Sequence, residues 1–211
     1  DFGANIYANY YTLYNYKDEK RITSFNYSDF SANFFTQTIF LNSYALGLGV
    51  QNEYTMLRPD INPFNMSTVY NKYFNLYSFL KFDTYNRSYF ATRGTQLYAE
   101  WRYLTPLYDK KITPGILLDG RYSIVIPIGK KLSLIPSVYS GISITDSIPE
   151  AYQYRIGGLA SFYVKNAFPF VGHKFLEYKS QNIAIARLDI QYELFKRNFV
   201  KISISWLTTA I

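Results

Sequence analysis

The feature that most constrains this chain is a strict alternation of polar and apolar side chains in residues 183–194, which read IAIARLDIQYEL. From Arg187 onward, every second residue is charged or polar and each intervening residue is apolar. Because successive side chains of a β-strand point to opposite faces of the sheet, one face of this strand is polar and the other is apolar. Residues 199–206 repeat the pattern, with a tryptophan among the apolar side chains. The pattern predicts a sheet with one apolar face.

The same alternation recurs along most of the chain. Strands are predicted at residues 4–14, 29–41, 44–56, 73–85, 95–103, 115–128 and 132–145, in addition to the two described above. In all we expect about ten antiparallel strands of roughly 8 to 14 residues, joined by alternating short and long connections. Residues 155–175, which read RIGGLASFYVKNAFPFVGHKF, follow neither a strand nor a helix period. This stretch predicts a long folded loop between two strands.

The chemistry of the two strand faces decides between a soluble and a membrane sheet. Aromatic residues make up 20% of the chain, with 23 Tyr and 17 Phe, and many lie near the ends of the apolar strand faces, as in the aromatic girdle of a membrane barrel. The polar faces mix charged residues with tyrosine and small residues such as Gly47 and Gly49. A soluble sandwich would carry many Lys and Glu on that face. We therefore predict an all-β, antiparallel transmembrane β-barrel, with a soluble β-sandwich or lipid-binding barrel as the alternative.

Charge and cysteine content narrow the chemistry further. The net charge is +7, but the Lys and Arg residues are scattered and lie opposite the aromatic faces, so no nucleic-acid surface is expected. The absence of cysteine excludes disulfides and thiolate metal sites. No apolar run approaches the ~18 residues of a transmembrane helix. The first residues do not form a signal peptide, so we expect that a targeting segment was removed or that the chain is an internal piece of a longer protein.

Two stretches carry a resemblance to a known family. Residues 82–101 contain Thr92-Arg93-Gly94-Thr95 ahead of an amphipathic strand, and Gly157 and Gly158 open the long loop. Both resemble motifs of the Omp85 superfamily, also called the bacterial surface antigen or D15 domain. The resemblance covers residues 74–206 and implies a bacterial outer-membrane barrel of about sixteen strands. It also implies that residues 1–211 are an incomplete barrel with strands missing at both ends, and that a loop at about residues 152–181 folds inward.

The tip of the loop departs from the family pattern. Where the family has Arg-Gly-aromatic, this chain has Tyr163, Val164 and Lys165, and a second candidate around Gly172 and His173 lacks the arginine. Residues 167–175, AFPFVGHKF, are similar to barrels that follow a patatin-like phospholipase domain in outer-membrane proteins of the Bacteroidetes kind. This resemblance implies a barrel that anchors or exports an attached lipase domain. The barrel of an outer-membrane protein insertase or translocase is the alternative.

The residues themselves predict little catalytic chemistry. No G-x-S-x-G motif occurs, so any lipase active site would lie in an attached domain that precedes Asp1. The single histidine, His173, is interpreted as a packed loop residue, and neither a metal nor a cofactor is expected. The charged side chains of the polar face are expected to line the lumen as a charged ladder, with a proton-transfer pair as the alternative. They are Arg102, Asp119, Arg121, Arg187, Asp189 and Glu193. The expected partners are outer-membrane lipid and either other envelope proteins or an attached domain.

The strand faces also predict the effect of substitutions. Ile190→Arg on the lipid face is expected to cost roughly 2 to 4 kcal/mol, whereas Gln191→Arg on the lumen face is expected to cost little.

Overall fold

The computed structural model describes residues 1–17, 20–61, 65–107, 113–145, 148–158, 166–170 and 172–210. Nine long strands form one antiparallel sheet in the order β1-β2-β3-β4-β5-β6-β7-β11-β12. A short 3₁₀ helix, η1, and a second sheet of three short strands lie between β7 and β11. None of the described residues forms a helix that is long and apolar enough to cross a membrane. The elements are β1 (Phe2–Lys17), β2 (Lys20–Phe40), β3 (Tyr44–Ile61), β4 (Val69–Asp83), β5 (Gly94–Pro106), β6 (Gly115–Ile128), β7 (Leu132–Ile144), η1 (Glu150–Tyr152), β8 (Tyr154–Ile156), β9 (Ala167–Phe168), β10 (Tyr178–Ser180), β11 (Asn182–Phe195) and β12 (Asn198–Ala210).

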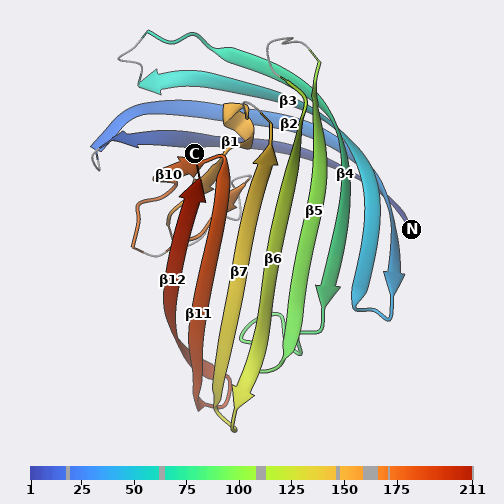
Figure 1. Ribbon diagram of the computed structural model, residues 1–211, viewed down its shortest axis with the longest axis vertical. Helices are drawn as coiled ribbons and strands as arrows, with labels where there is room; N and C mark the ends of the chain where they lie inside the picture. Colours follow the sequence, from blue (N-terminus) through green and yellow to red (C-terminus); the bar gives the residue numbers. More distant parts are fainter. Residues whose placement is uncertain are drawn as a thin grey trace.

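The large sheet is strongly curved (Figure 1). Every pair of neighbouring strands is antiparallel, and each strand pairs with the next one in the chain except that β7 pairs with β11. Among the described residues the sheet is not closed, so β1 and β12 are its two edges. The prediction of an all-β barrel fold is confirmed, with nine strands in the sheet where about ten were expected.

The two faces of the sheet differ as the alternation predicts. The concave face carries buried polar side chains such as Gln51, Glu53 and Asp189. The convex face carries large apolar side chains that remain exposed, for example Leu48 at 62% and Ile202 at 61%. A soluble protein would bury such side chains against a second layer, so this arrangement fits a sheet whose outer face contacts lipid. Further exposed members of the convex face are Ile6, Phe34, Leu46, Phe74, Leu76, Trp101, Ile126, Val138, Ile142, Leu194, Ile204 and Trp206.

Small residues on the concave face make room for aromatic rings of the neighbouring strand. Gly47 lies opposite Phe79, and Gly49 lies opposite Tyr77, in the pairing of β3 with β4. A Cβ atom at Gly47 would come within 2.3 Å of the Phe79 ring, and one at Gly49 within 2.4 Å of the Tyr77 ring. The glycines are thus covered by aromatic side chains, a device that supports strands weakened by glycine.

The first two strands are longer than predicted. β2 begins at Lys20 and not near residue 29, because its first half pairs with β1, with Tyr11 opposite Tyr27. Here Phe25 and Tyr27 point to the concave face and are buried, while the intervening Ser24 and Asn26 are polar. The concave face is therefore apolar at these two positions. The alternation of a polar inner and an apolar outer face does not hold here, so it does not predict this part of the strand.

The expectation for Gln191 is wrong. Its side chain lies on the concave face as predicted, but it is only 2% exposed, and its amide donates a hydrogen bond to the carbonyl oxygen of Ala91 at 3.0 Å. An arginine at this position would have to displace the turn between β4 and β5, so the substitution would be costly.

A better matched pair tests the assignment of the faces. Ile204→Arg places a charge on the exposed convex face and is expected to lower the free energy of unfolding in lipid vesicles by about 2–4 kcal/mol. Gln96→Arg places the same group on the concave face, where Gln96 is exposed and Asp83 can accept its hydrogen bond, so a change within ~0.5 kcal/mol is expected. Urea titrations followed by tryptophan fluorescence measure both. Equal losses would contradict the assignment.

Candidate functional site

The most distinctive part of the concave face is the segment between β7 and β11. We call residues 148–180 the lumenal insert; its described parts are 148–158, 166–170 and 172–180. It contains η1 and the small sheet, in which β8 pairs antiparallel with β10 and parallel with β9. Figure 1 shows these elements, in orange, inside the curve of the large sheet. The predicted loop therefore has a compact fold of its own.

Glycines shape the base of the lumenal insert. Gly157 has φ +131°, and a Cβ atom there would come within 2.1 Å of the Lys174 carbonyl oxygen. Gly158 has φ +82°, its amide donates to the His173 carbonyl oxygen at 3.2 Å, and its carbonyl accepts from the Phe170 amide at 3.0 Å. Both glycines therefore hold the chain in a conformation that other residues rarely adopt. Of the predicted motif residues, Gly157, Gly158 and His173 are brought together here.

The His173 side chain is held by the lumenal insert itself. Its Nδ1 atom lies 3.3 Å from a carboxylate oxygen of Glu177, and its ring meets Tyr178 edge to face at 4.7 Å. Gly172, just before it, has φ +98°. Among the described residues, no group of three or more His, Cys, Asp or Glu side chains is placed to hold a metal ion. These contacts are those of a packed loop residue.

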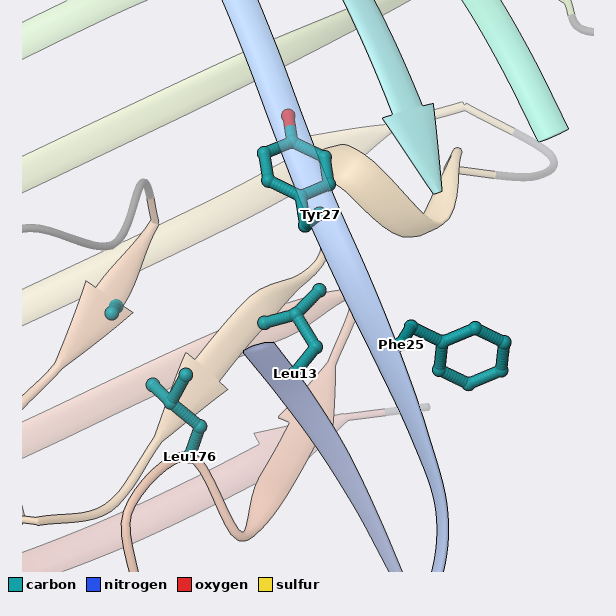
Figure 2. Close-up of a cluster of buried hydrophobic side chains, with 5 residues drawn as sticks. Leu13, Phe25, Tyr27 and Leu176 are labelled. Carbon is teal, nitrogen blue, oxygen red and sulfur yellow. The ribbon is translucent and has the colours of Figure 1, made fainter. Parts of the chain in front are cut away.

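Three buried apolar clusters join the lumenal insert to the large sheet. In the first, Leu176 and Ala167 of the insert pack with Leu13 of β1 and with Phe25 and Tyr27 of β2. Figure 2 shows Leu176 beside Leu13, with Tyr27 and Phe25 on the neighbouring strand.

The other two clusters lie further along the sheet. In the second, Ile148 and Tyr152 pack against a group formed by Tyr73, Leu104 and Leu117. In the third, Tyr154, Ile156 and Phe168 pack against Ile183 and Ile185. The lumenal insert is thus attached to β1 and β2, to β4, β5 and β6, and to β11.

A buried hydrogen-bond network accompanies the second cluster. The Tyr152 hydroxyl donates to a carboxylate oxygen of Glu53 at 2.5 Å and accepts from the Asn75 amide at 2.8 Å. All three side chains are at most 1% exposed. Burial, and then the neighbouring Glu53 carboxylate, raise the pKa of Tyr152 well above its usual value, so the hydroxyl stays protonated and can donate. The network fixes the insert to β3 and β4.

A second polar group stabilises the insert from within. The Arg155 guanidinium donates to Glu150 at 2.5 Å, and Lys179 lies 3.2 Å from the same carboxylate. Arg155 is 3% exposed, and burial lowers the pKa of its guanidinium, an effect that Glu150 opposes. These three side chains join η1 to β8 and β10.

The predicted lumen charges all lie on the concave face. Arg102 pairs with Glu100, next to Asp119 on the neighbouring strand. Asp189 lies 2.6 Å from Arg187 and 2.6 Å from Lys201. The remaining two make other contacts: Arg121 lies 5.3 Å above the Phe168 ring, and Glu193 accepts a hydrogen bond from the Arg197 amide in the β11–β12 turn.

Arg93, the last residue of the turn between β4 and β5, and Gly94, the first residue of β5, lie apart from the lumenal insert, near the opposite end of the sheet (Figure 1). The Asn86 side chain accepts from the Thr92 and Arg93 amides, and Gly94 has φ +115°. This turn also folds onto the concave face, where Ala91 packs with Val125 and Ile135. The Arg93 side chain itself is exposed.

Sequence reasoning did not single out Glu53, and it gave no role to Tyr152. The available signal was a single carboxylate on a strand face that otherwise carries only Ala, Gly and Gln in residues 45–53. An isolated charge there needs a partner from elsewhere in the chain.

A curved antiparallel sheet with an apolar outer face, and with loops folded onto its polar inner face, defines the class of membrane β-barrels. The chain matches the OMP85 superfamily over residues 1–209, and it therefore belongs to that superfamily of outer-membrane β-barrel proteins. The resemblance found in the sequence motifs is confirmed at this level.

A solved structure supports the fold assignment. The barrel of BamA from Haemophilus ducreyi, solved without POTRA domains 1–3, superposes with a TM-score of 0.65 at 15% sequence identity. The match covers 97% of this chain but only 46% of the BamA chain, so the chain spans less than half the length of that protein. No curated protein matches the chain.

The Tyr152 network can be tested directly. Tyr152→Phe removes the hydrogen bond to the buried Glu53 carboxylate and the one from the Asn75 amide, and it is expected to lower the free energy of unfolding by about 1–3 kcal/mol. Tyr178→Phe is the matched control, because Tyr178 is exposed at 45%, and we expect it to change stability by less than ~0.5 kcal/mol. Urea unfolding in vesicles measures both. A Tyr152→Phe variant as stable as the control would show that the network contributes nothing.

The base of the lumenal insert gives a second test. Gly157→Ala combines an unfavourable φ with a clash against the Lys174 carbonyl, whereas Gly172→Ala meets only the unfavourable φ, since no atom lies within 4 Å. We expect the first to destabilise the protein by about 1–3 kcal/mol more than the second. Rates of proteolysis within the insert provide the measurement. Similar rates for the two variants would contradict the close packing at Gly157.

Proposed function

We propose that this chain is the membrane-spanning part of a larger outer-membrane protein, and that the barrel anchors or exports an attached domain. The observation that carries the proposal is the attachment of the lumenal insert to the sheet through three apolar clusters. An insert attached in this way stiffens the sheet and occupies part of the space inside it, which leaves less room for an open pore. The resemblance of residues 167–175 to barrels that follow a patatin-like lipase domain favours a lipase as the attached domain.

The proposal includes additional strands. β1 and β12 end the described sheet, and open edges with unpaired backbone groups do not persist in a hydrocarbon environment. The chain also spans less than half the length of the BamA chain that it matches. We expect further strands of the same protein to join the two edges and complete the barrel.

A second candidate function is the insertion or translocation of other proteins, which the membership of the OMP85 superfamily implies. The edges of β1 and β12 favour it under the condition that the complete barrel leaves one edge strand unpaired, because an unpaired edge strand is a template for pairing with another chain. Other envelope proteins would then be the partners.

One experiment on the complete native protein separates the two functions. We expect the purified protein in lipid vesicles to hydrolyse phospholipid acyl esters. Its intact mass should show an attached domain, and the sequence of that domain should contain a G-x-S-x-G motif. Replacement of the motif serine by alanine should abolish hydrolysis. The parallel assay follows the folding of an unfolded outer-membrane barrel protein into the same vesicles by its electrophoretic mobility without boiling. Accelerated folding without hydrolysis would overturn the lipase proposal and support the second function.

A further inference from the structure

A cavity of about 780 Å³ lies between the lumenal insert and the wall of the sheet. Its wall residues come mainly from β4, β5 and β6, and Ala167, Phe168 and Pro169 of the insert cover it. The volume is in the range of small-ligand sites. Three cations line it, namely Lys81, Arg121 and Arg187.

Two of these cations differ from the other charges of the concave face. Arg187 is paired with Asp189, just as Arg102 is paired with Glu100. Lys81 and Arg121, by contrast, have no carboxylate oxygen within 4 Å among the described residues. Both side chains are exposed to solvent, so neither charge needs a carboxylate partner, and both remain available to an anionic ligand that enters the cavity.

Aromatic rings hold both cations without neutralising them. The Lys81 ammonium lies 4.9 Å from the centre of the Phe79 ring and 5.8 Å from that of Tyr98. The Arg121 guanidinium lies 5.3 Å from the centre of the Phe168 ring, which belongs to the lumenal insert. Cation–π contacts orient a cation and leave its positive charge available to a ligand.

The strand register places the two cations on one row of the sheet. Lys81 lies opposite Tyr98 in the pairing of β4 with β5, and Tyr98 lies opposite Arg121 in the pairing of β5 with β6. Their Cα atoms are therefore two strand spacings apart, about 10 Å.

Two carboxylates of this face, Asp83, which also lines the cavity, and Glu100, have other partners. Glu100 is occupied by Arg102 and Tyr98, and Asp83 accepts from the Tyr85 amide and from Gln96. Asp119 lies next to Arg121 on the same face of β6, but more than 4 Å from it.

We propose that this cavity binds a phosphate monoester, with Lys81 and Arg121 as its cationic ligands. A phosphate monoester carries a charge of roughly −1.5 to −2 at pH 7, which two cations balance and a single carboxylate would not. The guanidinium fork matches the phosphate oxygens. The phosphate could belong to a small soluble ester in the lumen or to a phospholipid headgroup. This ligand goes beyond the anchoring function and does not depend on it.

The test uses the complete native protein in a neutral detergent. Isothermal titration with glycerol 3-phosphate represents the soluble source, and dihexanoyl phosphatidic acid represents the lipid source. We expect saturable binding of at least one of them, weakened about tenfold or more by Lys81→Met and by Arg121→Met. Lys130→Met is the matched control, because Lys130 is exposed in the turn between β6 and β7 and its loss changes the net charge equally.

Each outcome of the titrations has a defined meaning. Binding of only one probe, with the expected sensitivity to both substitutions, supports the site and identifies its source of phosphate. No saturable binding of either probe, or equal affinities in the Lys81, Arg121 and Lys130 variants, overturns the proposal.

A measurement on the unsubstituted protein serves as an independent check. Acetylation of Lys81, followed by mass spectrometry, should slow in the presence of the bound probe, while acetylation of Lys130 should not change. Equal rates at Lys81 with and without a saturating probe would also overturn the proposal.

Discussion

The structure depends on one constraint, which is that the outer face of a membrane sheet has no water to satisfy polar groups. Backbone amides and carbonyls must pair within the sheet, and side chains that need hydrogen bonds must point inward. The concave face therefore receives Gln51, Glu53, Asn75 and Asp189, all of which are buried. A face with so many buried polar groups needs partners that the strands alone do not supply. Segments of the chain that fold inward provide some of them.

The same segments supply the apolar core. Each of the four buried apolar clusters contains at least one residue from the lumenal insert or, in the case of Ala91, from the β4–β5 turn. A soluble sandwich would build such clusters from a second sheet. In this protein the convex face is turned toward lipid, so loops take the place of the second layer. This also explains why Phe25 and Tyr27 are apolar residues on the concave face of β2, since they pack with the insert.

The sequence predicts features that depend on neighbouring residues, but not the contacts between residues that are distant in the chain. The alternation in residues 187–194 identified the strand and its inner face, because the pattern depends only on neighbouring residues and on the surrounding lipid. The contacts of that inner face depend on distant residues. Tyr152 meets Glu53 across 99 positions of the chain, and Gln191 meets Ala91 across 100. Alternation shows that Gln191 points inward, but it does not show whether water or a folded turn lies there. The motif glycines were identified through their resemblance to family motifs, and their positive φ angles explain why these positions carry glycine.

The energetics of the lumenal insert also bear on how such a barrel can work. Ile148, Ile156, Phe168 and Leu176 are buried apolar side chains of the insert. Burying each contributes about 1.5–3 kcal/mol, or roughly 6–12 kcal/mol together, which is similar to the whole stability of an ordinary domain. Removing the insert to open a central pore would therefore destabilise the sheet that surrounds it. The insert therefore opposes the opening of a solute pore through the centre of the sheet.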